Sequence, residues 1–146
     1  MNYRLLFVVS EDWYFVSHRL ALAKSAIQVG YNVALLSRYT NHRKVIENAG
    51  VEIIDWPLDR SSKNPLTELN AIKSIISSIR KFRPDIIHSV AMKPVIYSAI
   101  ASIFTGLDNR IFALAGLGFV FTSNRRSAKI LRPFLKVIFS LLFKGK

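Results

Sequence analysis

Five short apolar runs, each separated from the next by a helical stretch, constrain the fold of this chain more than any other feature. Between the runs, apolar residues recur every three or four positions, as in helices that cover a core. Short buried strands alternating with helices are typical of a parallel sheet with helices on both faces. We therefore predict one α/β domain with a Rossmann-like, doubly wound parallel sheet. The expected strands are 4–9, 33–36, 51–54, 85–88 and 110–113.

Glycine, proline and polar residues mark the expected boundaries of these elements. We predict a loop over 10–14 after the first strand and a helix that Gly30 closes. Asn41 is the expected cap of a short helix that ends near Gly50, and a longer helix follows the polar loop that ends at Pro65. That helix should stop before Pro84, while Pro94 and Gly106 suit the first turn and the end of the next one.

Composition excludes several classes of protein. A length of 146 residues suits one compact domain, and the absence of cysteine excludes disulfides, cysteine zinc sites and thiol nucleophiles. We expect no secretory signal, because the first apolar run stops at Ser10. No apolar run approaches the roughly 20 residues that a membrane-spanning helix needs.

The formal net charge of +12 is concentrated near the end of the chain. Residues 109–146 hold eight basic side chains and no acidic one, which gives +8 of the total. We divide the chain into a Rossmann-like domain over 1–124 and a basic amphipathic helix over 125–146. The basic face of that helix is predicted to contact an anionic membrane, while packing on its own domain stays an alternative. Nucleic acid is not an expected partner, because the tail lacks interleaved aromatic and basic residues. The predicted membrane-contact residues are Arg126, Lys129, Arg132 and Lys136.

Candidate functional residues follow the ends of the strands, where doubly wound sheets bind ligands. Two histidines expected at this edge are the candidate catalytic residues, and the other polar residues and a glycine pair are candidates for substrate binding. No phosphate-binding glycine motif, nucleophile elbow or local metal-ligand cluster is present, so no metal or cofactor is expected. The candidates are catalytic His18 and His88, and substrate-binding Asp12, Trp13, Arg19, Lys93, Gly116 and Gly118.

Four segments together resemble a known family. They are SEDWYFVSHRLAL at 10–22, PLDRSSKNPLTEL at 57–69, RPDIIHSVAMKPVIY at 83–97 and LAGLGFVF at 114–121. In this order they resemble the N-terminal domain of family-four GT-B glycosyltransferases, above all bacterial enzymes of capsule and O-antigen assembly. The resemblance implies a retaining, metal-independent transfer of a hexosyl or N-acetylhexosaminyl unit. The donor would be a nucleotide-sugar, and the acceptor a lipid-linked or growing polysaccharide.

The resemblance also implies how the parts of such an enzyme divide the work. The N-terminal domain would shape the acceptor side, with the segment 12–19, His88 and the turn 116–118 facing a cleft. Arg19 and Lys93 would contact phosphate. The donor-binding domain is not among these 146 residues, so the chain is expected to be inactive alone, in the cytoplasm at the inner face of the membrane. A non-catalytic, membrane-recruiting subunit of a split glycosyltransferase is the alternative.

Overall fold

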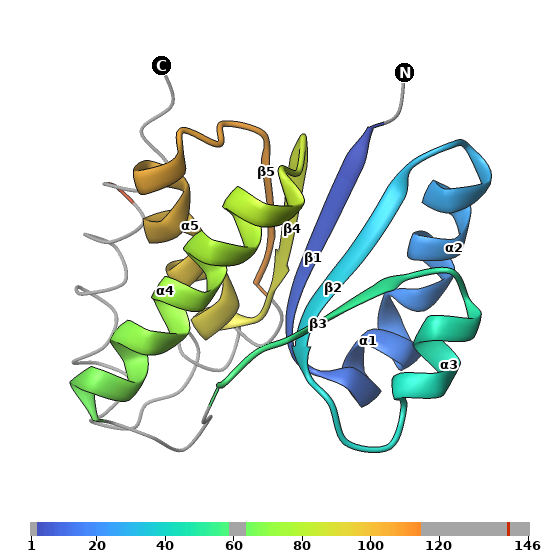
Figure 1. Ribbon diagram of the computed structural model, residues 1–146, viewed down its shortest axis with the longest axis horizontal. Coiled ribbons are helices and arrows are strands. Elements are labelled where there is room, and N and C mark those ends of the chain that lie inside the picture. The colour runs from blue at the N-terminus through green and yellow to red at the C-terminus, as the bar shows by residue number, and fades with distance from the viewer. Residues whose placement is uncertain (1–2, 59–63, 115–139, 141–146) are drawn as a thin grey trace, which may run out of the picture.

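A parallel sheet of five strands lies at the centre of the computed structural model, which describes residues 3–58 and 64–114 together with Ser140 (Figure 1). All neighbouring strands run parallel, in the order β3-β2-β1-β4-β5. This arrangement confirms the predicted Rossmann-like, doubly wound sheet. The strands are β1 (Arg4–Glu11), β2 (Asn32–Arg38), β3 (Glu52–Asp55), β4 (Ile86–Val90) and β5 (Arg110–Ala113).

Helices cover both faces of the sheet and complete two separate apolar clusters (Figure 1). On one face lie α1 (Asp12–His18), α2 (Leu20–Gln28) and α3 (Arg43–Asn48), and on the other lie α4 (Pro65–Phe82) and α5 (Met92–Thr105). Successive side chains of a strand point to opposite faces, so Phe7 packs toward α1 while Leu6 and Val8 pack toward α4. The central strands β1, β2 and β4 are mostly buried, with helices on both faces of the sheet, which explains their continuous apolar runs.

Several predicted boundaries are confirmed. Gly30 follows α2 with a φ of +94°, and Gly106 caps α5 with a φ of +69°, a backbone conformation that glycine adopts without steric cost. Pro94 lies in the first turn of α5, as expected. Pro65 opens α4, where the Asn64 side chain accepts a hydrogen bond from the backbone N–H of Leu66.

Two predicted boundaries are wrong. The expected loop over 10–14 is instead the end of β1 and the start of α1, in which Phe15 is fully buried edge-on against Phe7, with 5.3 Å between ring centroids. Burial of this ring makes a helix favourable where the local sequence indicates a loop. The expected cap Asn41 makes no cap, because α3 begins at Arg43 and the preceding His42 donates its backbone N–H to Asp12.

The tail helix predicted over 125–146, with Arg126, Lys129, Arg132 and Lys136, lies outside the described residues, and so do Gly116 and Gly118. Among the helices that are described, none is both long and apolar enough to cross a membrane.

Candidate functional site

β1 and β4 end at the edge of the sheet that also carries the start of α1 (Figure 1). Parallel strands all end at the same edge, which is why segments far apart in the sequence meet there. Asp12 and Trp13 begin α1, Arg19 joins α1 to α2, and His88 comes from β4.

Asp12 is an anchor for the loop between β2 and α3. Its side chain is fully buried, and both of its oxygens accept hydrogen bonds. Oδ2 accepts from the backbone N–H groups of Thr40 at 2.7 Å and His42 at 3.0 Å. Oδ1 accepts from the Thr40 hydroxyl and from the Trp13 N–H, both at 2.8 Å. Four donors therefore surround this carboxylate and fix the loop against the start of α1.

These hydrogen bonds also determine the protonation state of Asp12. Burial by itself would raise the pKa of its carboxyl group, because it penalises the charged form. The hydrogen bonds from Thr40, His42 and Trp13 outweigh burial and hold the pKa below its usual 3.8. Asp12 is therefore charged in the folded protein, where its carboxylate holds the loop between β2 and α3.

His88 lies inside β4, not at its end as the sequence predicted, because the strand continues through Ser89 and Val90. Its ring stacks on Phe7 of the neighbouring β1, with 5.0 Å between centroids, and the residue is only 8% exposed. Burial, and secondarily the positive charge of Arg19, lowers the pKa of His88 below 6.5. The imidazole is therefore neutral at pH 7.

Arg19 lies at the junction of α1 and α2. Its Nη1 donates to the carbonyl oxygen of His18 at 2.9 Å, whereas its Nε is buried and has no hydrogen-bond partner among the described residues. The positive charge of Arg19 contributes to the lowered pKa of His88. A neutral imidazole can accept a hydrogen bond or a proton, and a guanidinium can bind phosphate.

The remaining candidates are placed differently. Trp13 is about half exposed and contacts the ring of Tyr14 edge-on. His18 is exposed on α1, stacked on Tyr14 with 4.3 Å between centroids, and no contact within the described part of the chain joins it to His88. Lys93 belongs to the other helix layer, where its Nζ forms an ion pair of 2.8 Å with Glu68.

Sequence reasoning missed three contributors to this edge. Thr40 and His42 follow β2. Ligands of doubly wound sheets bind beyond the carboxyl ends of the strands, so the same reasoning that selected residues after the first and fourth strands could have selected these two. Ala91, between β4 and α5, adopts φ +78° and ψ 167°, a conformation in which side chains are strained. No signal in the sequence marks this alanine.

In the residues that the structure describes, no three His, Asp or Glu side chains gather closely enough to hold a metal ion.

The sequence matches a protein family described as glycosyl transferase 4-like, over residues 4–145. The chain belongs to this glycosyl transferase 4-like family. No curated protein matches the sequence.

Solved structures share the fold of this glycosyl transferase 4-like chain. MurG from Acinetobacter baumannii superposes with a TM-score of 0.61 and 16% identity, over 75% of this chain and 34% of MurG. A glycosyltransferase from Rickettsia africae ESF-5 superposes with a TM-score of 0.60 and 23% identity, over 77% of this chain and 29% of that protein. The calicheamicin glycosyltransferase CalG4 superposes with a TM-score of 0.58 and 12% identity, over 94% of this chain and 43% of CalG4. The chain therefore spans about a third of the length of the first two.

The role of Asp12 as an anchor predicts a large effect of Asp12→Asn on stability. An amide offers one acceptor oxygen in place of two, so buried donors lose their partner, and the free energy of unfolding should fall by about 2–4 kcal/mol. A lowered pKa in the folded state adds stability above about pH 4, which is lost as the pH falls through the folded pKa. The variant should therefore lose less stability on acidification than the wild type. Urea denaturation at several pH values measures both effects. The exposed Asp108→Asn is the control. An equal fall in the free energy of unfolding for the two variants would contradict the role of Asp12 as an anchor.

The positive charge of Arg19 predicts that the pKa of His88 changes when this charge is removed. Arg19→Met removes the positive charge that disfavours protonation, so the pKa of His88 should rise toward 6.5. NMR shifts of the imidazole protons as a function of pH report this change. Lys24→Met removes an exposed charge on α2 and should leave the titration of His88 unchanged. An unchanged pKa in the Arg19 variant would show that the two groups do not interact.

Proposed function

We propose that this domain is the acceptor-side half of a glycosyltransferase. It would help to move a hexosyl or N-acetylhexosaminyl unit from a nucleotide-sugar to a lipid-linked or growing polysaccharide, such as a capsule or O-antigen. Membership of the glycosyl transferase 4-like family supports sugar transfer. The observation that carries the proposal is the buried His88 of β4, which stacks on Phe7 and whose pKa is lowered by burial and by the positive charge of Arg19.

Each residue of this edge has a role in the proposal. The imidazole of His88 would accept a hydrogen bond or proton from a sugar hydroxyl, which only its neutral form can do. The guanidinium of Arg19 would bind the phosphate of a lipid-linked acceptor, for which its planar donors are suited. The exposed indole of Trp13 would cover one face of a sugar.

The other predicted residues enter the proposal with narrower roles. His18, exposed at the end of α1, would be a second catalytic residue at the acceptor side. Lys93 would reach phosphate after its ion pair with Glu68 opens. Gly116 and Gly118 would let a backbone turn approach the ligand. The nucleotide-sugar would be a substrate of a retaining reaction that needs no metal or other cofactor.

The full activity would need a second half. Because the chain spans about a third of the first solved relatives, we infer that a further domain or a partner chain binds the donor. The chain alone would then transfer little sugar. The alternative, a non-catalytic subunit that recruits an enzyme to the membrane, gives no reason for a neutral imidazole beside a guanidinium.

The basic tail would hold the domain at an anionic membrane surface, on the cytoplasmic side where nucleotide-sugars would be supplied. Arg126, Lys129, Arg132 and Lys136 would contact lipid headgroups, each worth on the order of 1 kcal/mol near the surface. A peripheral position would bring the polar edge of the sheet to a lipid-linked acceptor.

The proposed acceptor role predicts binding of a short-chain polyprenyl diphosphate sugar. The backbone amide NMR signals of Trp13, Arg19 and His88 should shift on titration, and Arg19→Met should weaken binding roughly tenfold through the loss of a charge-assisted hydrogen bond. Lys24→Met is the control and should bind like the wild type. An absence of shifts at these residues would contradict the acceptor role. Sugar transfer by the 146-residue chain alone would contradict the need for a donor half.

The proposed membrane role predicts sedimentation with vesicles that contain phosphatidylglycerol. The full chain should bind such vesicles, bind less as the salt concentration rises, and ignore vesicles of neutral phosphatidylcholine. Replacing Arg126, Lys129, Arg132 and Lys136 together by Gln should abolish binding. Replacing Lys24, Lys44, Lys73 and Arg80 by Gln removes the same number of charges elsewhere and is the control. Undiminished binding of the tail variant would contradict the assignment.

A further inference from the structure

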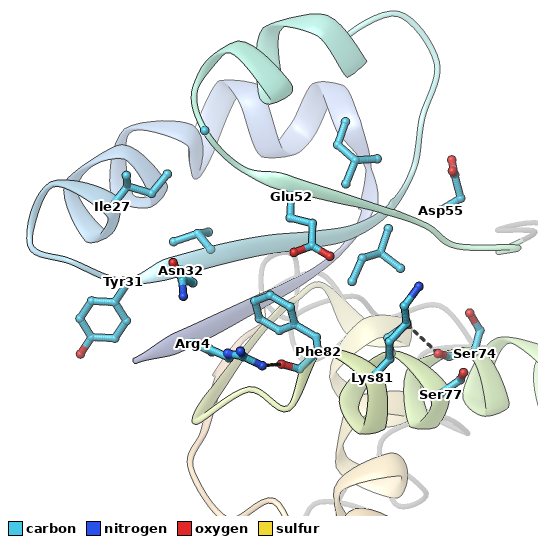
Figure 2. Close-up of a pocket in the computed structure, with 15 residues that line it drawn as sticks. Arg4, Ile27, Tyr31, Asn32, Glu52, Asp55, Ser74, Ser77, Lys81 and Phe82 are labelled. Carbon is cyan, nitrogen blue, oxygen red and sulfur yellow. Dashed lines mark hydrogen bonds between the residues drawn. The ribbon is translucent and has the colours of Figure 1, made fainter. Parts of the chain in front are cut away.

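A groove of about 710 Å³ runs along the edge strand β3, where α4 faces it (Figure 2). Arg4, Asn32 and Glu52 line it from the sheet, and they are the first residues of β1, β2 and β3. The groove therefore includes the edge of the sheet opposite to the one where Asp12 lies, and neither Asp12 nor His88 lines it.

Internal contacts fix the walls of this groove. The guanidinium of Arg4 donates a hydrogen bond of 2.8 Å to the carbonyl oxygen of Phe82 and lies 5.8 Å from the centre of its ring. Asp55 forms two hydrogen bonds with Arg43, of 2.6 and 2.7 Å. The groove is thus a preformed feature of the fold, as ligand sites usually are.

Five polar groups on these walls are left for a ligand. They include a carboxylate, an ammonium, an amide and two hydroxyls, and none of them has a hydrogen bond or ion pair within the described part of the chain. Figure 2 shows the side chain of Glu52 from β3 and that of Lys81 from α4 extending toward the space between the two elements. The five groups belong to Asn32, Glu52, Ser74, Ser77 and Lys81.

The chemistry of these groups suits a neutral, hydroxyl-rich ligand. The formal charges of the residues that line the groove sum to zero, because Arg4 and Lys81 are positive and Glu52 and Asp55 are negative, so the groove does not favour a polyanion such as a nucleotide. Carboxylate and amide oxygens accept hydrogen bonds from hydroxyl groups, and amide, hydroxyl and ammonium groups donate to them. Tyr31 and Ile27 add apolar surface for the C–H faces of a sugar ring.

We propose that the groove between β3 and α4 binds a neutral oligosaccharide. It deepens the proposed function, on which it rests, because it gives the glycan part of the acceptor a subsite away from His88. The volume lies within the usual range of ligand pockets, about 300–1,000 Å³.

Titration of the 146-residue chain with maltotriose, cellotriose and triacetylchitotriose, without nucleotide or lipid, tests this inference. At least one trisaccharide at millimolar concentration should shift the backbone amide signals of residues 52–55 and 74–82. Glu52→Ala and Lys81→Met should each weaken that binding roughly tenfold, because each removes a charged hydrogen-bonding group. Ser74→Trp should block the groove and abolish binding. Arg80→Met, an exposed neighbour of Lys81 that does not line the groove, is the matched control.

The proposal is overturned if no trisaccharide shifts these residues, if Ser74→Trp binds like the wild type, or if a nucleotide shifts them as strongly as the sugars do. Amide signals keep this result separate from the acceptor experiment, which reads Trp13, Arg19 and His88, none of which lines the groove. Sugar binding in the groove without acceptor binding at His88 would contradict the proposed acceptor site and leave the groove assigned as a glycan site.

Discussion

The central position of β1 organises this structure, because β1 forms hydrogen bonds with both β2 and β4 and has an apolar cluster on each face. Leu6 and Val8 enter one cluster, and Phe7 and Val9 enter the other. Each such side chain gains about 1.5–3 kcal/mol on burial, so a charge within this stretch would be costly. The buried acidic residues therefore lie at the carboxyl end of the strand: Glu11 is the last residue of β1, and Asp12 follows it.

The protein stabilises two buried ionisable groups, Asp12 after the end of β1 and His88 within β4, in opposite ways. Asp12 keeps its charge, because four hydrogen-bond donors replace the water that it has lost. His88 loses its charge, because it lies against Phe7 and near the positive Arg19. The two residues therefore have different roles. The carboxylate of Asp12 is used in internal hydrogen bonds, whereas the neutral ring of His88 can still accept a proton.

The periodicity of the sequence predicted the sheet well, and it predicted the start of the polar edge less well. The runs of apolar residues reflect burial on both faces, which is a local property that a sequence displays. The helix at Asp12–His18 was not predictable in this way, since it depends on Phe15 packing against Phe7 and on donors from Thr40 and His42. Likewise, Lys93 was predicted to contact phosphate, but in the folded protein it forms an ion pair with Glu68 of another helix.

The sequence by itself determined the α/β class, the approximate strands and the edge at which polar residues collect, because these follow from spacing and from the direction of parallel strands. Tertiary structure decided which of those residues are committed to internal contacts and which are open to a ligand. It also decided the protonation of His88 and created the groove beside β3, whose walls come from four separate segments. Such properties depend on distances between residues far apart in the chain, and spacing along the sequence does not contain those distances.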